Sequence, residues 1–165
     1  MLYDYCPKCG GKYTLDEGEN KLQCRKCSFV LYRNSKPTAS VLILDKGRLL
    51  LGRRRIEPSK GKWDVIEGFL NNGEHPVDGA IREVREETGL EVDPYELLGF
   101  FMDVYGPTKE PTLNICFIGK RIKGELRPGD DIEKLKWFKR DEIPRDIAFQ
   151  NGKDMIEAWL QKSLK

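Results

Sequence analysis

Residues 68–90 read GFLNNGEHPVDGAIREVREETGL, and this stretch has the features of one amphipathic helix with a defined start and end. Pro76 suits the first position of a helix, and Gly89 suits its C-terminal cap. Between them, side chains with apolar character recur at helical spacing and predict a stripe that faces a sheet. The stripe consists of Val77, Ala80, Ile81, Val84 and Thr88.

Three carboxylates crowd this helix. Glu83, Glu86 and Glu87 share an arc of roughly 100° beside the apolar stripe on a helical wheel. The same wheel puts Arg82 and Arg85 on the other side. Like charges three or four residues apart repel by about 0.2–0.5 kcal/mol per pair. One interpretation is a solvated charged face. The other is a site for a divalent cation, because Mg²⁺ prefers oxygen ligands and commonly bridges carboxylates and phosphate oxygens.

The same stretch resembles the signature motif of a known family. It matches every specified position of the Nudix box, G-x5-E-x7-R-E-U-x-E-E-x-G-U, where U is an aliphatic residue. The matching residues are Gly68, Glu74, Arg82, Glu83, Val84, Glu86, Glu87, Gly89 and Leu90. ASVLILDKGRLLLGRRR, the stretch around Trp63 and DIEKLKWFKRDEIP also resemble parts of the Nudix domain, so the resemblance covers residues 36–165.

This resemblance implies both a fold and a reaction. The implied fold is α+β, a Nudix α/β/α sandwich with a mixed sheet, preceded by a small β zinc ribbon. The implied enzyme is a Nudix pyrophosphohydrolase. It would use Mg²⁺ or Mn²⁺ to cut the pyrophosphate bond of a nucleoside diphosphate linked to another moiety. The implied ligands of the catalytic metal are Gly68, Glu83, Glu86, Glu87 and Asp131.

The resemblance also implies roles for neighbouring side chains. Arg82, paired with Glu74, would orient the glutamates, although a purely structural ion pair is the alternative. One glutamate or a loop acid would help to deprotonate the attacking water. Asp131 could equally be an ordinary exposed loop acid. The candidates for substrate binding are Arg53, Arg54, Phe101 and Tyr105, with Phe69 and Phe149 as further aromatic candidates and a place in the core as the alternative for the aromatic residues.

Residues 1–35 differ in style from the rest and predict a separate module. They hold Cys6-Pro-Lys-Cys9 and Cys24-Arg-Lys-Cys27, a spacing typical of a tetrahedral four-thiolate zinc site. A disulfide interpretation needs an oxidising compartment, for which the sequence gives no support. The zinc is expected to be structural, and residues 36–165 form the second predicted domain. Cys116, in the apolar run LNICFIG, is expected to be a buried small hydrophobic residue.

Composition limits the partners of the chain. Its 165 residues carry a formal net charge of +2, which favours a nucleotide small molecule over nucleic acid or a membrane surface. The first ten residues lack the pattern of a signal peptide, so the expected location is cytoplasmic. Nudix relatives are often dimers, so a homodimer is one expectation.

Two departures from the family pattern bear on the substrate. Glu67 stands where many relatives have the first Gly of a Gly-Gly pair, and it could add a carboxylate near the metal or crowd the turn. The SQPWPFP-like stretch of NADH diphosphatases is absent, and Pro107 resembles a Pro of ADP-ribose-hydrolysing relatives. ADP-ribose is therefore slightly favoured. The alternatives are FAD or NADH, or a non-catalytic Nudix protein that senses a ligand or binds nucleic acid through the ribbon.

Apolar runs predict the remaining elements of the second domain. A hairpin is expected around Asp45-Lys46-Gly47, followed by several strands and a closing helix. The expected strands are Ala39–Leu44, Arg48–Leu51, Trp63–Ile66, Tyr95–Tyr105, Thr112–Ile122 and Lys134–Phe138, and the closing helix is Asp154–Gln161.

Overall fold

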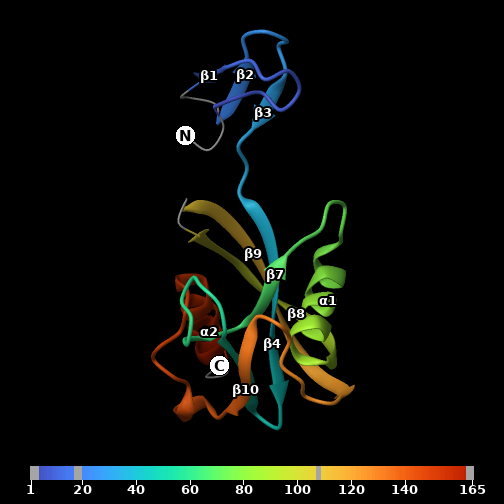
Figure 1. The fold of residues 1–165 in the computed structure, drawn as a ribbon. Coiled ribbons are helices and arrows are strands. Elements are labelled where there is room, and N and C mark those ends of the chain that lie inside the picture. The colour runs from blue at the N-terminus through green and yellow to red at the C-terminus, as the bar shows by residue number, and fades with distance from the viewer. Residues whose placement is uncertain (1–3, 17–19, 107–108, 163–165) are drawn as a thin grey trace.

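The computed structural model describes residues 4–16, 20–106 and 109–162, which form a small three-stranded sheet and a larger mixed sheet between two helices (Figure 1). The elements are β1 (Tyr13–Asp16), β2 (Lys21–Cys24), β3 (Val30–Tyr32), β4 (Lys36–Asp45), β5 (Arg48–Arg54), β6 (Trp63–Asp64), β7 (Ile66–Phe69), α1 (Pro76–Thr88), β8 (Leu90–Tyr105), β9 (Glu110–Gly124), β10 (Ile132–Phe138), a 3-10 turn (Arg140–Glu142) and α2 (Gln150–Lys162). Pro107, singled out above, lies outside the described residues.

The large sheet is mixed, as predicted. Its strand order is β10-β5-β4-β9-β8, with β6 paired to β5 and β7 paired to β4. The β4–β9 pair is parallel and the other strand pairs are antiparallel. α1 packs on one face of the sheet and α2 on the other (Figure 1). The α+β sandwich and the small cysteine-bearing β sheet before it are therefore confirmed.

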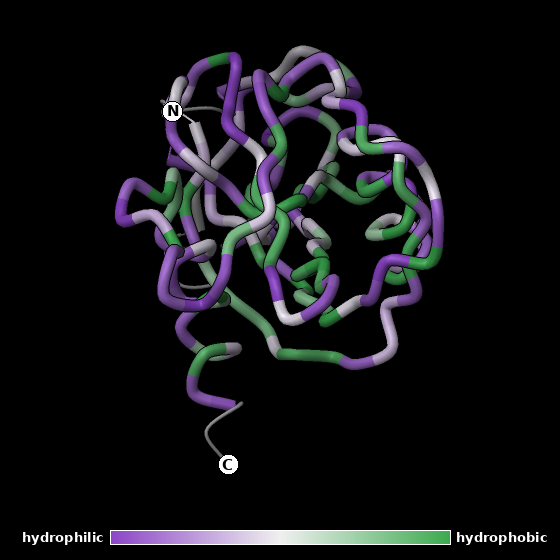
Figure 2. The backbone as a smooth tube through the Cα atoms, turned by 90° about the horizontal axis from the view of Figure 1, so that it is seen from below, coloured by the Kyte–Doolittle hydropathy of each residue, from purple (hydrophilic) through white to green (hydrophobic). Residues whose placement is uncertain are grey.

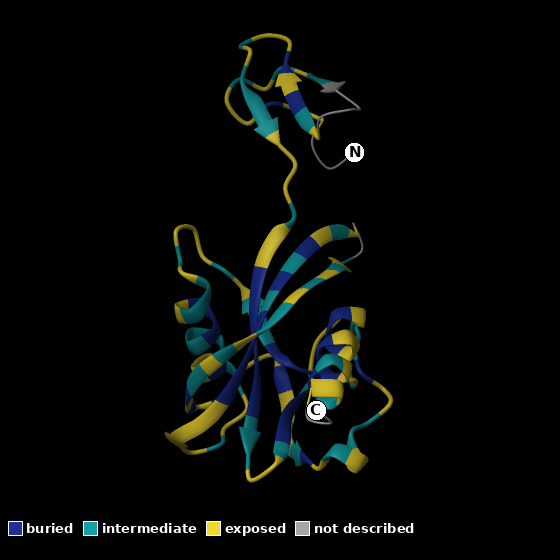
Figure 3. Cartoon of the chain, turned by 180° about the vertical axis from the view of Figure 1, so that it is seen from behind, coloured by how far each residue is buried: buried dark blue, intermediate teal, exposed yellow. Residues whose placement is uncertain are grey.

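The central strand β4 is buried on both faces. Val41 packs with Val84 of α1 in one apolar cluster, and Leu42 packs with Met155 of α2 in the other. Alternation along the strand sends successive side chains to opposite faces, so a continuous apolar run is needed where both faces are covered. Figure 3 shows this buried centre, and Figure 2 shows hydrophobic segments gathered between the two helices.

The helix α1 starts and ends where the sequence predicts. The His75 Nδ1 accepts a hydrogen bond from the Val77 N–H, and Pro76 occupies the first turn. Gly89 follows the helix with φ of 70°, a left-handed conformation that favours glycine. Of the predicted apolar stripe, Ala80, Val84 and Thr88 are buried and the other two residues are partly exposed.

The predicted strands and the closing helix each differ from the structure at one or both ends. The predicted strand Trp63–Ile66 is divided into β6 and β7, and α2 begins before the predicted Asp154. β8 begins at Leu90, directly after the helix, rather than at Tyr95. Its register against β9 shifts near Glu91 and near Pro94, so the alternation that marks a strand is interrupted there. In the described part of the chain, no helix is long and apolar enough to cross a membrane.

Candidate functional site

Gly68 brings the β7 backbone close to the glutamates of α1. It pairs with Ala39 of β4, and α1 packs across this part of the sheet. A Cβ atom at Gly68 would lie 2.0 Å from Glu83 Cδ and 2.3 Å from both Glu83 carboxylate oxygens. Any side chain here would have to displace that carboxylate, so glycine is the residue that lets it rest against the strand.

Arg82 ties the glutamates of the motif together. Its Nε and Nη2 donate to the two Glu74 carboxylate oxygens, both at 2.8 Å, and its Nη2 also donates to the Phe69 carbonyl at 3.0 Å. Its Nη1 donates to Glu83 at 2.6 Å and to Glu86 at 3.1 Å. Arg82 projects from the other side of the helical wheel, and its long side chain bends back across the helix to reach Glu83 and Glu86.

A cavity lies between the end of α1, the sheet and the start of α2. Its walls hold six carboxylates and, of the described residues, one basic side chain, Arg54. Arg54 is already engaged, since its Nη1 lies 3.2 Å from Asp64 Oδ2. The acidic residues lining the cavity are Asp64, Glu67, Glu83, Glu87, Asp103 and Asp131.

This concentration of carboxylates disfavours their ionised forms. Burial, followed by the charges of Glu83 and Asp64, raises the pKa of Glu87 to about 9. Burial also raises the pKa of Asp64 to about 7, although Arg54 opposes the shift. Burial and the charge of Asp64 raise the pKa of Glu67 to about 8. The positive charge in the cavity is therefore too small to stabilise the ionised forms of its carboxylates.

The residues of the cavity fit a divalent cation. The donors are carboxylate oxygens, which Mg²⁺ and Mn²⁺ prefer, and a cation would relieve the unfavourable ionisation of Glu87. The glycine at position 68 adds a close backbone approach to Glu83. The chemistry of these donors therefore suits a hard cation, while in the described part of the chain the cysteines are the group whose ligand atoms converge within 4.8 Å.

The predicted site residues divide into two groups. The residues that line the cavity are Gly68, Glu83, Glu87, Asp131, Arg54, Tyr105, Phe69 and Phe149. Outside the lining are Glu86, Glu74 and Arg82, which are joined by the Arg82 hydrogen bonds. Two more predicted residues lie elsewhere. Arg53 donates to the Gly61 carbonyl at 2.8 Å, and Phe101 packs against the apolar cluster under α2.

Some cavity residues are not evident from the box. Asp64, Asp103, Asn114 and Asn151 also line or contact the cavity wall. The sequence could have indicated Asn114, because an amide in the middle of an apolar strand must find buried hydrogen-bond partners. The other three become neighbours only through the pairing of the sheet and the position of α2.

Three aromatic rings form one wall of the cavity. The Phe69 and Tyr105 rings meet edge to face with centroids 5.5 Å apart, and the Tyr105 and Phe149 centroids are 5.9 Å apart. The Arg54 guanidinium lies over the Phe149 ring, 4.8 Å from its centroid. Such a wall offers a surface on which a flat or apolar group can pack.

The four N-terminal cysteines converge on one point. The Sγ atoms of Cys6, Cys9, Cys24 and Cys27 all lie within 4.8 Å of one another. Burial alone would raise the pKa of Cys24, but backbone N–H groups of Cys27 and Lys26 and neighbouring thiols lower it to about 6, which favours the metal-binding thiolate. The Tyr13 hydroxyl is buried without a hydrogen-bond partner in the described part of the chain. The cluster fits a four-coordinate zinc ion.

Residues 34–160 match the family model described as NUDIX domain. The chain is 32% identical over 161 residues to NAD-capped RNA hydrolase NudC of Pseudomonas aeruginosa (strain LESB58), covering 96% of this chain and 56% of that protein. It is 32% identical over 126 residues to ADP-ribose pyrophosphatase of Methanocaldococcus jannaschii, covering 74% of this chain and 72% of that protein.

The similarity extends to solved structures. A NUDIX hydrolase from Nitrosomonas europaea matches with a TM-score of 0.80 and 30% identity, covering 96% of this chain and 91% of that one. The chain spans about half the length of the NudC relatives that it matches.

Proposed function

Because the chain belongs to the NUDIX family, we propose that it hydrolyses the pyrophosphate bond of a nucleoside diphosphate linked to another moiety, with ADP-ribose as the favoured substrate. The chain is a Nudix hydrolase, and the proposal concerns what it cuts and which residues act. The observation that carries it is the approach of Gly68 to Glu83 inside a cavity that also contains Glu87 and Asp131.

The residues of the site have three proposed roles: binding the cation, orienting its ligands and accepting a proton. Glu83, Glu87 and Asp131 would hold the catalytic cation from the cavity wall, and Glu86 would extend this set at the helix surface. Arg82 fixes Glu83 and Glu86 through direct hydrogen bonds and is itself held by Glu74. Mg²⁺ or Mn²⁺, when bound, neutralises phosphate charge and makes water a better nucleophile. A buried carboxylate such as Glu87 accepts the proton that the attacking water releases.

ADP-ribose is favoured for two reasons. The relative from Methanocaldococcus jannaschii whose name is ADP-ribose pyrophosphatase is similar over most of both chains. The aromatic wall of Phe69, Tyr105 and Phe149 gives the cavity room for one non-phosphate group against an apolar surface.

Hydrolysis of NAD-type dinucleotides, including NAD-capped RNA, is a second candidate. The observation that favours it is that the similarity to NudC covers 96% of this chain, the cysteine module included. In this case the four-cysteine module would belong to the part of the chain that this activity shares with NudC.

A substrate panel tests the proposal. It contains ADP-ribose, NADH, NAD, FAD, NAD-capped RNA, diadenosine polyphosphates and nucleoside triphosphates, each with Mg²⁺, Mn²⁺ or EDTA, with products identified by mass. We expect metal-dependent release of AMP and ribose 5-phosphate from ADP-ribose, with Glu83→Gln as the inactive control. Turnover of no compound, together with salt-sensitive binding of nucleic acid, would support a binding protein instead.

A further inference from the structure

Glu67 lies on the opposite face of β7 from the metal-facing glycine. It pairs with Ser40 of β4, and its neighbours Ile66 and Gly68 point toward α1. Because side chains alternate along a strand, Glu67 points toward α2 and into the cavity. It therefore neither crowds the turn nor shares a face with Gly68.

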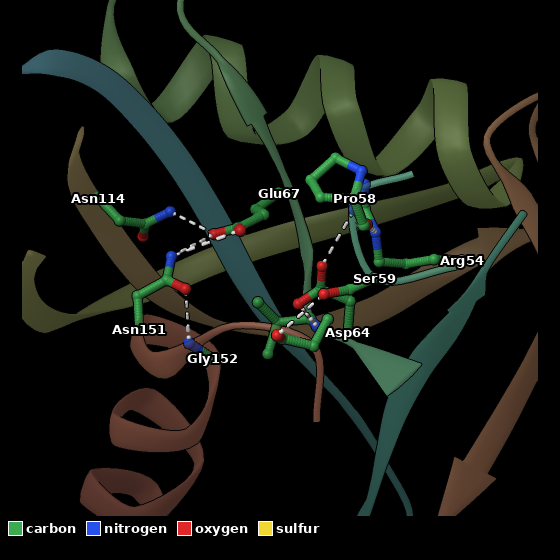
Figure 4. A network of polar contacts seen from close by, with 10 residues as sticks. Arg54, Pro58, Ser59, Asp64, Glu67, Asn114, Asn151 and Gly152 are labelled. Carbon is green, nitrogen blue, oxygen red and sulfur yellow. Dashed lines mark hydrogen bonds and ion pairs between the residues drawn. The ribbon is translucent and has the colours of Figure 1, made fainter. Parts of the chain in front are cut away.

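Two amides hold the Glu67 carboxylate. The Asn114 Nδ2 donates to Oε2 at 2.6 Å, and the Asn151 Nδ2 donates to Oε2 at 3.0 Å, with a longer contact of 3.4 Å to Oε1 (Figure 4). These bonds use Oε2 twice and leave Oε1 with one long contact. Oε1 is therefore the oxygen with capacity for a bound molecule.

Each amide is itself fixed so that its donor faces Glu67. The Asn114 Oδ1 accepts a hydrogen bond from the Ser40 hydroxyl at 2.8 Å. The Asn151 Oδ1 accepts one from the Gly152 N–H at 2.8 Å (Figure 4). The Asn151 N–H donates to Asp103 at 2.9 Å. The carboxylate is thus positioned by amides from β9 and α2, which are held in turn by residues of β4, β8 and α2, and this is how a protein fixes a recognition group.

The cavity limits what can meet this carboxylate. An anionic group is disfavoured beside Asp64, Glu67 and Asp103, because the one basic side chain among the described lining residues already pairs with Asp64. Glu67 lines the same cavity as Glu83 and Glu87, so a group that reaches Glu67 would share this cavity with the phosphates of a substrate bound there. In ADP-ribose, the favoured substrate, the groups joined directly to the two phosphates are both sugars.

We propose that Glu67 is a specificity-determining residue that binds a hydroxyl group of the sugar joined to the diphosphate. A hydroxyl both donates and accepts, so it can pair with Oε1 of Glu67 whether the carboxyl group is ionised or protonated. The aromatic wall then packs against the remainder of the same moiety. This inference rests on the proposed function and names the chemistry that the cavity selects.

Matched substrates test the inference. Each pair compares ADP-ribose with an analogue that changes one part of it. The analogues are 2′-deoxy-ADP-ribose, which lacks a hydroxyl of the adenosine sugar, an ADP alkyl ester, which lacks the terminal sugar, and IDP-ribose, which changes the base. A hydrogen bond to a charged group contributes about 1.5–3 kcal/mol. With the wild-type protein, kcat/KM for one of the two hydroxyl-deficient compounds should therefore be roughly 10- to 100-fold lower than kcat/KM for ADP-ribose. The IDP-ribose pair should differ little. A preference confined to the IDP-ribose pair would overturn the proposal in favour of a base contact.

Variants separate recognition from structure. Glu67→Ala should bring the preference between the two members of the sensitive pair close to unity, whatever its effect on the turnover that both members share. Glu67→Gln should restore part of the preference, since it keeps a hydrogen-bonding group at this place. Equal losses on both members, or an unchanged preference, would overturn the proposal.

The outcome also distinguishes this inference from the proposed function. Turnover with no effect of Glu67→Ala on the preference refutes the inference alone. Turnover of no diphosphate refutes the proposed function. Calorimetric titration in Mg²⁺ then tests the inference by itself: the ratio of the dissociation constants of the two members of a pair is measured for the wild-type protein and for Glu67→Ala. Equal ratios in both proteins would refute it.

Discussion

At the scale of single residues, Gly68 is where the β7 backbone closely approaches the Glu83 carboxylate, a proposed metal ligand. We predict that Gly68→Ala lowers kcat/KM by on the order of 100-fold, because the new methyl group must displace the Glu83 carboxylate that lies 2.0 Å from its position. The fold should be little changed, because Glu83 can rotate away while the backbone stays in place. Steady-state kinetics and thermal unfolding measure the two effects.

A double-mutant cycle shows whether Gly68 acts through Glu83. If it does, Gly68→Ala should add no further loss of activity to a Glu83→Ala protein, because the displaced carboxylate is already gone. Additive losses in kcat/KM would mean that the methyl group harms the site by another route.

Glu87 is a buried carboxyl group whose ionisation lowers the stability of the folded protein. Its pKa is about 9 in the folded protein against 4.5 for the free side chain, so folding favours the protonated form. The stabilising effect of that proton is complete below pH 4.5 and is lost as the pH rises toward 9. We predict that Glu87→Gln stabilises the metal-free protein at pH 7–8 by about 1 kcal/mol, or roughly 2–4 °C in Tm, while it abolishes hydrolysis.

The control is the same pair of proteins with a divalent cation. Mg²⁺ should raise the Tm of the wild-type protein and have a smaller effect on Glu87→Gln, because a ligand that binds only the folded state stabilises it. A Glu87→Gln protein that is less stable than wild type without metal would contradict the expected destabilising charge.

The sequence indicated some of these residues and not others, for a physical reason. Gly68, Glu83 and Glu87 lie within one strand-to-helix unit, so local spacing is enough to bring them together. Asp103 and Asn151 meet the same cavity from β8 and α2. Their approach depends on long-range strand pairing and helix packing, which no local pattern encodes.

At the scale of elements, the pair of Glu74 and Arg82 fastens the segment before α1 to the helix. The hydrogen bonds of Arg82 lower the pKa of Glu74 to about 2, from 4.5 for the free side chain. Because the folded-state pKa is depressed, the stabilising effect is complete above about pH 5 and is lost as the pH falls toward 2. We predict that Glu74→Gln lowers stability at pH 7 and that its difference from wild type vanishes near pH 2–3.

Urea unfolding at a series of pH values measures this difference. Arg85→Gln is a matched control, since Arg85 is an exposed arginine of the same helix. It should show no such pH dependence. A Glu74→Gln difference that persists at low pH would show that shape and packing, rather than charge, hold the segment.

The elements themselves were predictable where local signals agreed. α1 has a proline in its first turn, an apolar stripe and a capping glycine, and its bounds agree with the sequence prediction. β8 runs from Leu90 through Pro94 to Tyr105, and the proline and the register shifts break the alternation expected of a strand. The sheet tolerates them because β8 is an edge strand, where a missing N–H costs little.

At the scale of the whole molecule, the cysteine module and the catalytic cavity are built from separate parts of the chain. β1, β2 and β3 form a sheet of their own, which stands apart from the large sheet in Figure 1. The described residues that line the cavity lie between Thr38 and Asn151. The two metal centres should therefore be separable by experiment.

We predict that Cys24→Ser removes the zinc of residues 1–35 without lowering kcat/KM for a small diphosphate substrate in Mg²⁺. A four-thiolate site that loses one ligand binds zinc far less tightly, and a module of this size depends on its metal to fold. Metal analysis should show the loss of zinc, and limited proteolysis should cut residues 4–33 while residues 36–162 resist. Cys116→Ser is the control, since Cys116 is buried in the large sheet and should leave the zinc in place. If hydrolysis of the small substrate disappears together with the zinc, the module must complete the catalytic site, and the two parts of the chain act as one unit.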